Sequence, residues 1–189
     1  MENSNAELLA ELHEKLKKCK KCSELVTNRT QVVPGDGNPH ADIMFVGEAP
    51  GRDEDIQGIP FVGAAGQLLN QLMEKSGISR ESVFIGNVLK CRPPDNRDPQ
   101  DNEIANCREY LHAQITLIQP KLICTLGNPS LKTLIDKSLT IGRVHGTVLT
   151  KKGLNFFPIY HPAASLHNPS LKASLVEDFE KLKAHLREM

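Results

Sequence analysis

The sequence predicts an α/β fold in which a mostly parallel sheet carries helices on both faces. Short apolar runs alternate along the chain with longer runs whose apolar residues recur every three or four positions. This alternation is typical of βα units. The predicted strands are residues 43–46, 83–85, 122–126 and 156–160. Because ligands bind beyond the carboxyl ends of such strands, we expect functional loops after Val46, Ile85, Leu126 and Tyr160.

The helices are predicted from apolar spacing and from their ends. Residues 65–75 carry Leu68, Leu69, Leu72 and Met73 at helical spacing and stop near Gly77, which suits a helix cap. Residues 102–118 repeat the apolar period after an acidic start. Residues 130–135 are expected to form a short helix and residues 171–186 a final amphipathic one, and the charged segment 1–18 is helical in pattern.

Length and composition favour a single domain over residues 1–189. The formal net charge is zero, which argues against wholesale coating of nucleic acid but permits a local basic face. No run reaches the ~18 apolar residues of a membrane span, and residues 1–18 lack the apolar core of a signal peptide. We therefore expect a cytoplasmic, monomeric protein without membrane attachment.

Five cysteines in a reducing compartment indicate metal ligands or core residues rather than disulfides. Cys19 and Cys22 form a CxxC in a basic context, and Cys91 and Cys107 lie in and after a loop that follows the second strand. Four thiolates suit either zinc or a [4Fe–4S] cluster, and spacing does not choose between them. Cys124 lies in the middle of a strand and is interpreted as a core residue.

Two loops carry residue types suited to binding a base. Residues 47–54 are rich in glycine, so their backbone can approach a ligand closely. Phe61 follows in a Gly/Pro-rich stretch, either as a stacking platform or as a core residue. After the last strand, His161 faces the glycine-rich loop across one sheet edge. Leu166 in the same loop is either a wedge into a base stack or a staple on the final helix.

These residues together resemble the family 4 uracil-DNA glycosylases, the iron–sulfur branch of the uracil-DNA glycosylase superfamily. The resemblance runs from Cys19 to about Pro169. Besides the cysteines, it rests on GEAPG at 47–51, PFVGAAGQLL at 60–69, NVLKCRPP at 87–94 and HPAA at 161–164. It implies a three-layer αβα sandwich with a central four-stranded parallel sheet. It also implies a structural [4Fe–4S] cluster whose ligands are Cys19, Cys22, Cys91 and Cys107.

The resemblance further implies that the chain hydrolyses the N-glycosidic bond of uracil flipped out of DNA. Phe61 would stack on the ring, Asn87 would read its edge, and His161 would donate to O2 as negative charge develops. The loop positions of Ala49 and Gly51 would border the base. In family 1 relatives an aspartate stands where this chain has Ala49, and a tyrosine where it has Gly51, so the water-activating residue does not transfer.

Glu48, Glu54 and Asn96 are the candidates to position the attacking water or the sugar. A histidine-bearing insertion found in a covalently linking branch is absent, so free uracil is the expected product, and His145 is interpreted as a loop residue near the DNA or a structural one. If the cluster joins its ligand segments, nearby cations would converge on DNA phosphates: Lys17, Lys18, Lys20, Lys21, Lys90, Arg92 and Arg97.

Three other interpretations stay open at this point. The chain could be a glycosylase of broader scope that acts on other deaminated bases. It could be a non-enzymatic iron–sulfur protein that binds DNA or carries electrons, for which Asn87, Phe61 and His161 would not be needed together. It could also be a zinc protein. Replication or repair partners are not indicated by any motif.

Overall fold

The computed structural model describes residues 4–189. The first three residues of the helical segment expected at 1–18 lie outside the described residues. The helices are α1 (Asn5–Lys17), α2 (Ser23–Asn28), α3 (Arg52–Gln57), α4 (Ala64–Lys75), α5 (Asp101–Ile118), α6 (Asn128–Leu134), α7 (Ile141–Val144), α8 (Pro162–His167) and α9 (Ser170–Glu188). The strands are β1 (Asp36–Gly37), β2 (Ile43–Gly47), β3 (Phe84–Asn87), β4 (Leu122–Leu126), β5 (Leu149–Lys151) and β6 (Leu154–Ile159).

The expected parallel sheet is confirmed. Its strands follow the order β1-β3-β2-β4-β6-β5, and β3, β2, β4 and β6 are mutually parallel. Two short antiparallel strands, β1 and β5, extend this sheet at its edges. They are polar and largely exposed, so no hydrophobic alternation marks them in the sequence.

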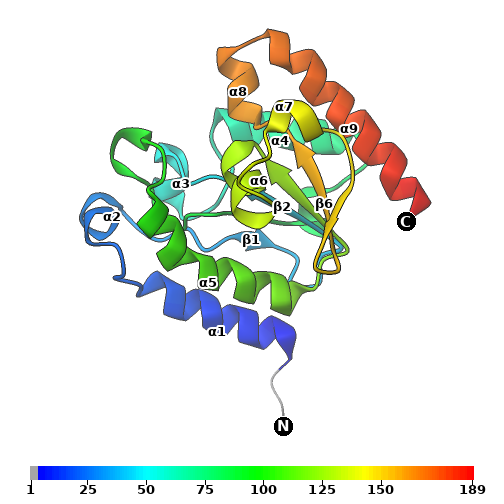
Figure 1. The fold of residues 1–189 in the computed structure, drawn as a ribbon. Coiled ribbons are helices and arrows are strands. Elements are labelled where there is room, and N and C mark those ends of the chain that lie inside the picture. The colour runs from blue at the N-terminus through cyan, green and yellow to red at the C-terminus, as the bar shows by residue number, and fades with distance from the viewer. Residues whose placement is uncertain (1–3) are drawn as a thin grey trace.

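Helices cover both faces of the sheet, which gives the three layers (Figure 1). On one face α4 and α9 pack over Phe45, Ile85 and Phe157 in one apolar cluster. On the other face α1, α5 and α6 pack over a second cluster that contains Met44, Val46 and Phe156. Successive residues of each buried strand thus serve opposite layers, which explains why the strands read as continuous apolar runs.

The strand order creates a crevice at one edge of the sheet. β2 comes first among the parallel strands but lies between β3 and β4 in the sheet. The next strand, β3, therefore lies on one side of β2, and the later strands β4 and β6 lie on the other side. Such a switch point opens a crevice at the carboxyl ends of the strands. The register places Gly47, the last residue of β2, beside Asn87, the last residue of β3. This edge is where the predicted functional loops meet.

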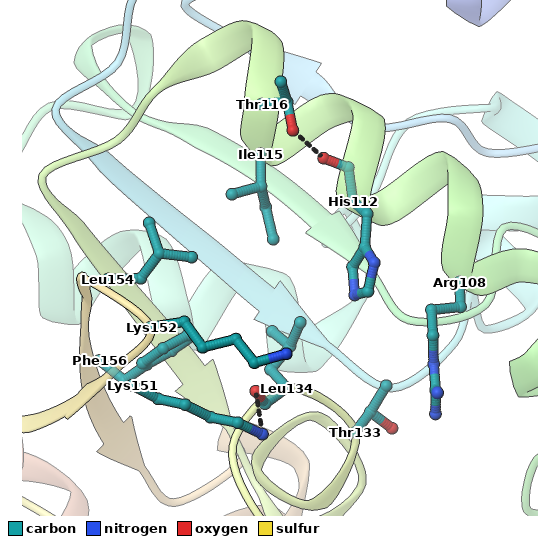
Figure 2. A pocket seen from close by; sticks show the side chains of 10 residues that line it. All are labelled: Arg108, His112, Ile115, Thr116, Thr133, Leu134, Lys151, Lys152, Leu154 and Phe156. Carbon is teal, nitrogen blue, oxygen red and sulfur yellow. Dashed lines mark hydrogen bonds between the residues drawn. The ribbon is translucent and has the colours of Figure 1, made fainter.

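A second hollow lies on the face covered by α5 and α6. It is bounded by α5, by α6 and by the turn between β5 and β6 (Figure 2). Its volume is about 410 Å³. Among residues 4–189 no helix is both long and apolar enough to cross a membrane.

Candidate active site

A cavity of about 170 Å³ opens at the carboxyl ends of β2, β3 and β6. An apolar cavity of ~150 Å³ accepts benzene, so this one has room for a single six-membered ring. Its lining residues come from three parts of the chain, namely the segment that follows β2, the end of β3 and the segment that follows β6. They are Ala49, Gly51, Glu54, Phe61, Ala65, Asn87, His161 and Ala163. The structure therefore brings Asn87, Phe61 and His161 together, as their proposed joint role requires.

Asn87 brings an unpartnered acceptor to this cavity. Its side chain is 2% exposed, and its Oδ1 is buried without any hydrogen-bond partner among the described residues. A buried polar atom left unpaired costs about 1–3 kcal/mol, which points to a ligand that completes it. Gly47 permits this arrangement, because a Cβ there would lie 2.5 Å from Asn87 Oδ1 and 2.6 Å from the Phe61 ring.

Phe61 is held in a conformation that a bulky residue rarely adopts. Its φ is +53°, in the left-handed region, and such strain tends to mark functional positions. Arg80 holds the segment by donating to Pro60 O at 2.7 Å and to Phe61 O at 3.2 Å. Gly66 lets α4 lie close against the backbone of Phe61, because a Cβ at this position would lie 2.0 Å from Phe61 O. The ring is thereby turned toward His161, at 5.6 Å between ring centroids.

His161 is fixed in one tautomer by the backbone N–H of Ala163. It is the N-cap of α8, and its Nδ1 accepts the Ala163 N–H at 3.0 Å. A neutral imidazole that accepts at Nδ1 carries its proton on Nε2. Burial lowers the pKa of His161 to about 4, so the ring is neutral at pH 7. A neutral Nε2–H donor therefore belongs to the wall of the cavity.

A buried carboxylate supports the strand end that carries His161. Asp178 of α9 is 0% exposed; its Oδ2 accepts the Tyr160 N–H at 3.3 Å, and its Oδ1 lies 2.6 Å from His145 Nδ1. Burial raises the pKa of Asp178 while both hydrogen bonds oppose that rise. Within the described residues His145 thus has a structural contact, packed 4.6 Å from the Tyr160 ring.

The three candidates for water positioning lie in different places. Glu54 lines the cavity, and its Oε1 accepts the N–H groups of Val62 and Gly63 at 3.1 and 3.0 Å. Glu48 lies outside the lining residues, and burial followed by the nearby Asp98 raises its pKa. Asn96 also lies outside the lining and accepts from Arg92 Nε at 2.8 Å. Only Glu54 is therefore beside the cavity.

Leu166 lies on α8, five residues after His161, and is 50% exposed. The sequence predicted that His161 and Leu166 share a loop, whereas residues 162–167 form a short helix. The apolar side chain is thus presented from a helix at the same edge of the sheet as the cavity. This placement suits the wedge better than a packed staple.

The four predicted ligand cysteines gather in one small cluster around Leu16, Leu25 and Leu89. Arg29 donates to Cys91 Sγ at 3.1 Å and to Cys19 O at 2.7 Å, and Asn106 donates to Cys22 Sγ at 3.4 Å. Burial raises the pKa of the Cys107 thiol to about 11. Cys124, by contrast, is a core residue in β4, as predicted.

This donor set, with four cysteines and N–H donors on two of their sulfurs, suits a metal centre bound by thiolates. Within residues 4–189, no three His, Cys, Asp or Glu side chains lie close enough together to hold a metal ion as they stand. A zinc site needs all its thiolates about 2.3 Å from one metal, whereas an iron–sulfur cluster spreads four thiolates around a larger body. The N–H donors on Cys22 and Cys91 sulfurs match the hydrogen bonds that tune such clusters.

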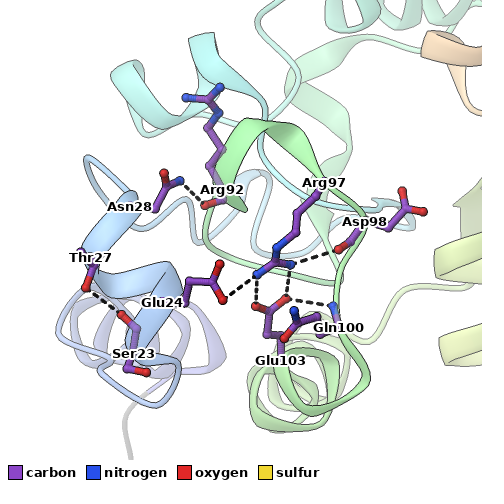
Figure 3. Close-up of polar contacts among 9 residues, drawn as sticks. All are labelled: Ser23, Glu24, Thr27, Asn28, Arg92, Arg97, Asp98, Gln100 and Glu103. Atoms are coloured by element: carbon purple, nitrogen blue, oxygen red, sulfur yellow. Dashed lines mark hydrogen bonds and ion pairs between the residues drawn. The ribbon is translucent and has the colours of Figure 1, made fainter.

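Polar side chains hold the cysteine segments in place (Figure 3). Arg97 makes two hydrogen bonds with the buried Glu103, at 2.7 and 3.0 Å, and reaches Glu24 of α2 at 3.4 Å. Asn28 donates to Arg92 O at 3.1 Å. The loop that contains Cys91 is therefore tied both to α2, next to Cys22, and to the start of α5, which carries Cys107.

The expected basic patch is smaller than the sequence indicates. Lys90 was expected to contact DNA phosphates, and this is wrong: it is 0% exposed and donates to Gln114 Oε1 at 2.7 Å. Lys17 pairs with Glu14 and Lys21 with Glu109. Arg97 is committed to Glu103. Lys18, Lys20 and Arg92 remain as cations with no ion pair among the described residues.

Sequence reasoning missed two residues that support the site. Arg80 stands in a polar turn and carries no local signal of its role. Asp178 does carry one, because it lies on the apolar stripe of α9 between Leu175 and Leu182, where an acid needs partners. Ala65 and Ala163 fall inside quoted motifs without an assigned role.

Comparison with known proteins agrees with this geometry. Residues 34–187 match the family described as the Uracil DNA glycosylase superfamily. The chain is 49% identical to a type-4 uracil-DNA glycosylase of Sulfurisphaera tokodaii, covering 93% of this chain and 83% of that protein. It is 45% identical to the type-4 enzyme of Thermotoga maritima over 96% of both chains, and 44% identical to that of Archaeoglobus fulgidus over 93% and 92%. The chain therefore belongs to the uracil-DNA glycosylase superfamily and, within it, to the type-4 uracil-DNA glycosylases.

Proposed function

We propose that this chain is a monofunctional glycosylase that hydrolyses the N-glycosidic bond of uracil flipped out of DNA, which initiates base excision repair. One observation carries the proposal: the unpartnered Asn87 Oδ1 is buried in a ring-sized cavity that Phe61 and His161 also line. Family membership supports the same activity. The proposed protein is a single-domain cytoplasmic monomer that releases free uracil.

Asn87 would select uracil by its hydrogen-bonding edge. The amide oxygen accepts from uracil N3–H, and the amide nitrogen donates to O4. Cytosine presents the opposite pattern, so its groups and the buried Oδ1 would stay unpaired. A site built to make hydrogen bonds rejects such a mismatch strongly. Phe61 would stack on the ring, which is worth roughly 1–3 kcal/mol and offsets part of the cost of flipping.

His161 would act on the leaving base. As the glycosidic bond breaks, negative charge develops on uracil O2. The neutral Nε2–H of His161 donates to that oxygen without transferring a full charge into the cavity. A preorganised donor of this kind contributes about 3–4 kcal/mol. The Asp178–Tyr160 hydrogen bond holds the strand end beneath it, so the imidazole does not need to reorganise during the reaction.

Glu54 is the proposed residue for holding the attacking water. Of its two oxygens, Oε1 is committed to two backbone N–H groups, and Oε2 lies 2.8 Å from where a Gly51 Cβ would be. A glycine at 51 therefore leaves space next to a carboxylate oxygen at the cavity. Ala49 supplies no base, and the oxocarbenium-like sugar needs only a positioned water on its open face.

The cysteine cluster would hold a [4Fe–4S] group through Cys19, Cys22, Cys91 and Cys107. When bound, that group supplies four metal–thiolate bonds and joins α1, the Cys91 loop and α5. Leu166 would enter the space left by the flipped nucleotide. Lys18, Lys20 and Arg92 would add salt-dependent phosphate contacts.

The test uses the whole protein and an oligonucleotide that carries one uracil. Alkaline cleavage after incubation should cut the strand at that position, and an otherwise identical strand with cytosine or thymine should stay intact. Equal cleavage of a hypoxanthine-containing strand would shift the assignment to a broader deaminated-base glycosylase. Binding without strand cleavage by folded, iron-loaded protein would contradict the proposal and favour a non-enzymatic role.

A further inference from the structure

A groove runs along α5 on the face of the sheet opposite α9. The hollow of Figure 2 and a neighbouring one of about 500 Å³ share Arg108 and Thr133 in their linings, so they lie side by side along α5. α5 contributes Asp101, Arg108 and His112 on one helical stripe. From residue 101 to residue 116 that wall is about 22 Å long. The groove is therefore too long for a small molecule to fill.

The groove gathers more positive than negative charge, because Asp101 is the one carboxylate among its lining residues. Arg108, Lys132, Lys137 and Lys152 line it, and none of them forms an ion pair within the described part of the chain. Burial lowers the pKa of His112, and Arg108 and Lys152 lower it further. In a chain of zero net charge, four unpaired cations along one groove favour an anionic occupant.

The floor of the groove is aliphatic. Ile115, Leu134 and Leu154 lie beneath the cationic rim. Of the two aromatic rings among the lining side chains, Phe156 is 2% exposed, and the His112 imidazole is the exposed one. Single-stranded nucleic acid binds where successive bases stack on a series of open aromatic faces, whereas the groove offers a single imidazole. Apolar side chains that alternate with carboxylates fit both the floor and the rim.

The end of the groove beside Lys152 lies far from the base cavity. Lys152 precedes β6 and His161 follows it, so the six residues of β6 separate them by about 20 Å. Lys151 in the same turn is committed to the end of α6 through Ile135 O and Leu134 O. An occupant at this end would leave the DNA-reading edge open.

From these observations we propose that the α5–α6 groove is a docking site for an acidic segment of a partner protein that carries leucine-like side chains between its carboxylates. Charge complementarity assigns the carboxylates to Arg108, Lys132 and Lys152. The aliphatic floor assigns the apolar anchors to the space beside Leu154. This site acts independently of the proposed glycosylase activity.

The test measures fluorescence polarisation of labelled synthetic peptides at physiological salt. The probe alternates pairs of Glu with Leu; one control peptide replaces every Glu by Ser, and another replaces every Leu by Ser. Only the probe should bind saturably. Lys132→Glu with Lys152→Glu should weaken it about tenfold, and Thr133→Trp, which fills the shared wall, should weaken it without changing charge.

The matched control is Arg187→Glu on α9, an exposed cation on the other face, which should leave peptide affinity unchanged. All variants should excise uracil at the parent rate in the absence of peptide, which shows that they fold. No saturable binding of the probe, equal binding of the three peptides, or an equal loss with Arg187→Glu would overturn the proposal. So would displacement of the probe by an oligothymidylate whose own affinity falls in the groove variants, because the groove would then be a nucleic-acid surface.

Discussion

The base cavity and the cysteine cluster are assembled by different means. At the cavity, charged side chains fasten the backbone: Glu54 accepts two N–H groups, Arg80 donates to two carbonyls, and Asp178 accepts the Tyr160 N–H. The cysteine cluster instead includes Cys91 and Cys107, the pKa values of which are raised by burial, so metal ligation would have to replace their protons. The cavity is formed by protein side chains alone, whereas the proposed cluster would add the final bonds to the cysteine region. Reaction rate and stability should therefore be separable by mutation.

The largest effect is expected at the cavity. His161→Ala removes the donor to O2 and should lower the single-turnover excision rate by about 10²–10³, with DNA affinity nearly unchanged. Loss of an N-cap costs about 1 kcal/mol, so the Tm should fall by only about 2–4 °C. The matched control is His167→Ala, at an exposed site on the same helix. A variant with weakened binding and an unchanged rate would make His161 a binding residue only.

Asn87→Asp should relax substrate choice by about tenfold or more. A protonated carboxyl can present its O–H to cytosine N3, whereas the amide in the orientation that reads uracil points its oxygen there. The measurement is the ratio of excision rates on matched oligonucleotides with uracil or cytosine. Asn102→Asp, an exposed change of the same type on α5, should leave that ratio unchanged. If Asn87→Asp also leaves it unchanged, the edge-reading role belongs to another residue.

Cys107→Ser tests the other half of the comparison. It should reduce iron content and lower the Tm by about 10 °C, because several kcal/mol of ligation are lost. The rate per folded, iron-loaded molecule should stay near the parent value. Cys124→Ala in β4 should leave iron content intact. A Cys107→Ser protein with full iron content and normal stability would remove Cys107 from the ligand set.

Leu166→Ala should act only when a base must be extracted from a duplex. We expect excision from double-stranded DNA to fall severalfold, because the wedge offsets unstacking of a few kcal/mol only in part. Excision from single-stranded DNA should be unaffected. Leu8→Ala, an exposed leucine on α1, serves as the control. Equal losses on both substrates would indicate a packing role for Leu166.

Acid should destabilise the folded protein through two buried imidazoles, one at the base cavity and one on α1. The pKa of His161 and that of His13 in α1 are lowered to about 4, in each case mainly by burial. The unfolded chain takes up these protons near pH 6.5, and the folded protein does so only near pH 4. The free energy of unfolding should therefore fall by several kcal/mol, on the order of 3–6, between pH 6.5 and pH 4, with the smaller share from the less buried His13.

His13→Gln should remove part of that slope in denaturant titrations, because Gln still meets Gln114 without binding a proton. His40→Gln, at an exposed site, should not change it. The excision rate should stay level down to about pH 5, since His161 remains neutral there. A rate that halves near pH 6.5 would contradict the buried, neutral imidazole.

The sequence predicts the buried strands and the long helices well, because continuous apolar runs and helical spacing report burial directly. It fails where backbone contacts decide the outcome. The glycine-rich loop was expected to extend through residue 54, yet α3 already begins at Arg52, and its Asp55 accepts the N–H of Thr30. β5 has no apolar period because it is an exposed edge. At the site, motifs identified Asn87, Phe61 and His161, but nothing local reveals the left-handed φ of Phe61 or the Arg80 contacts that hold it.

The most direct test of the account is a crystal structure of the protein with free uracil. We predict the ring in the cavity against Phe61, with Asn87 Oδ1 within about 2.7–3.2 Å of N3 and His161 Nε2 at a similar distance from O2. Uracil bound elsewhere, or bound in the cavity with Asn87 turned away to a protein partner, would contradict it.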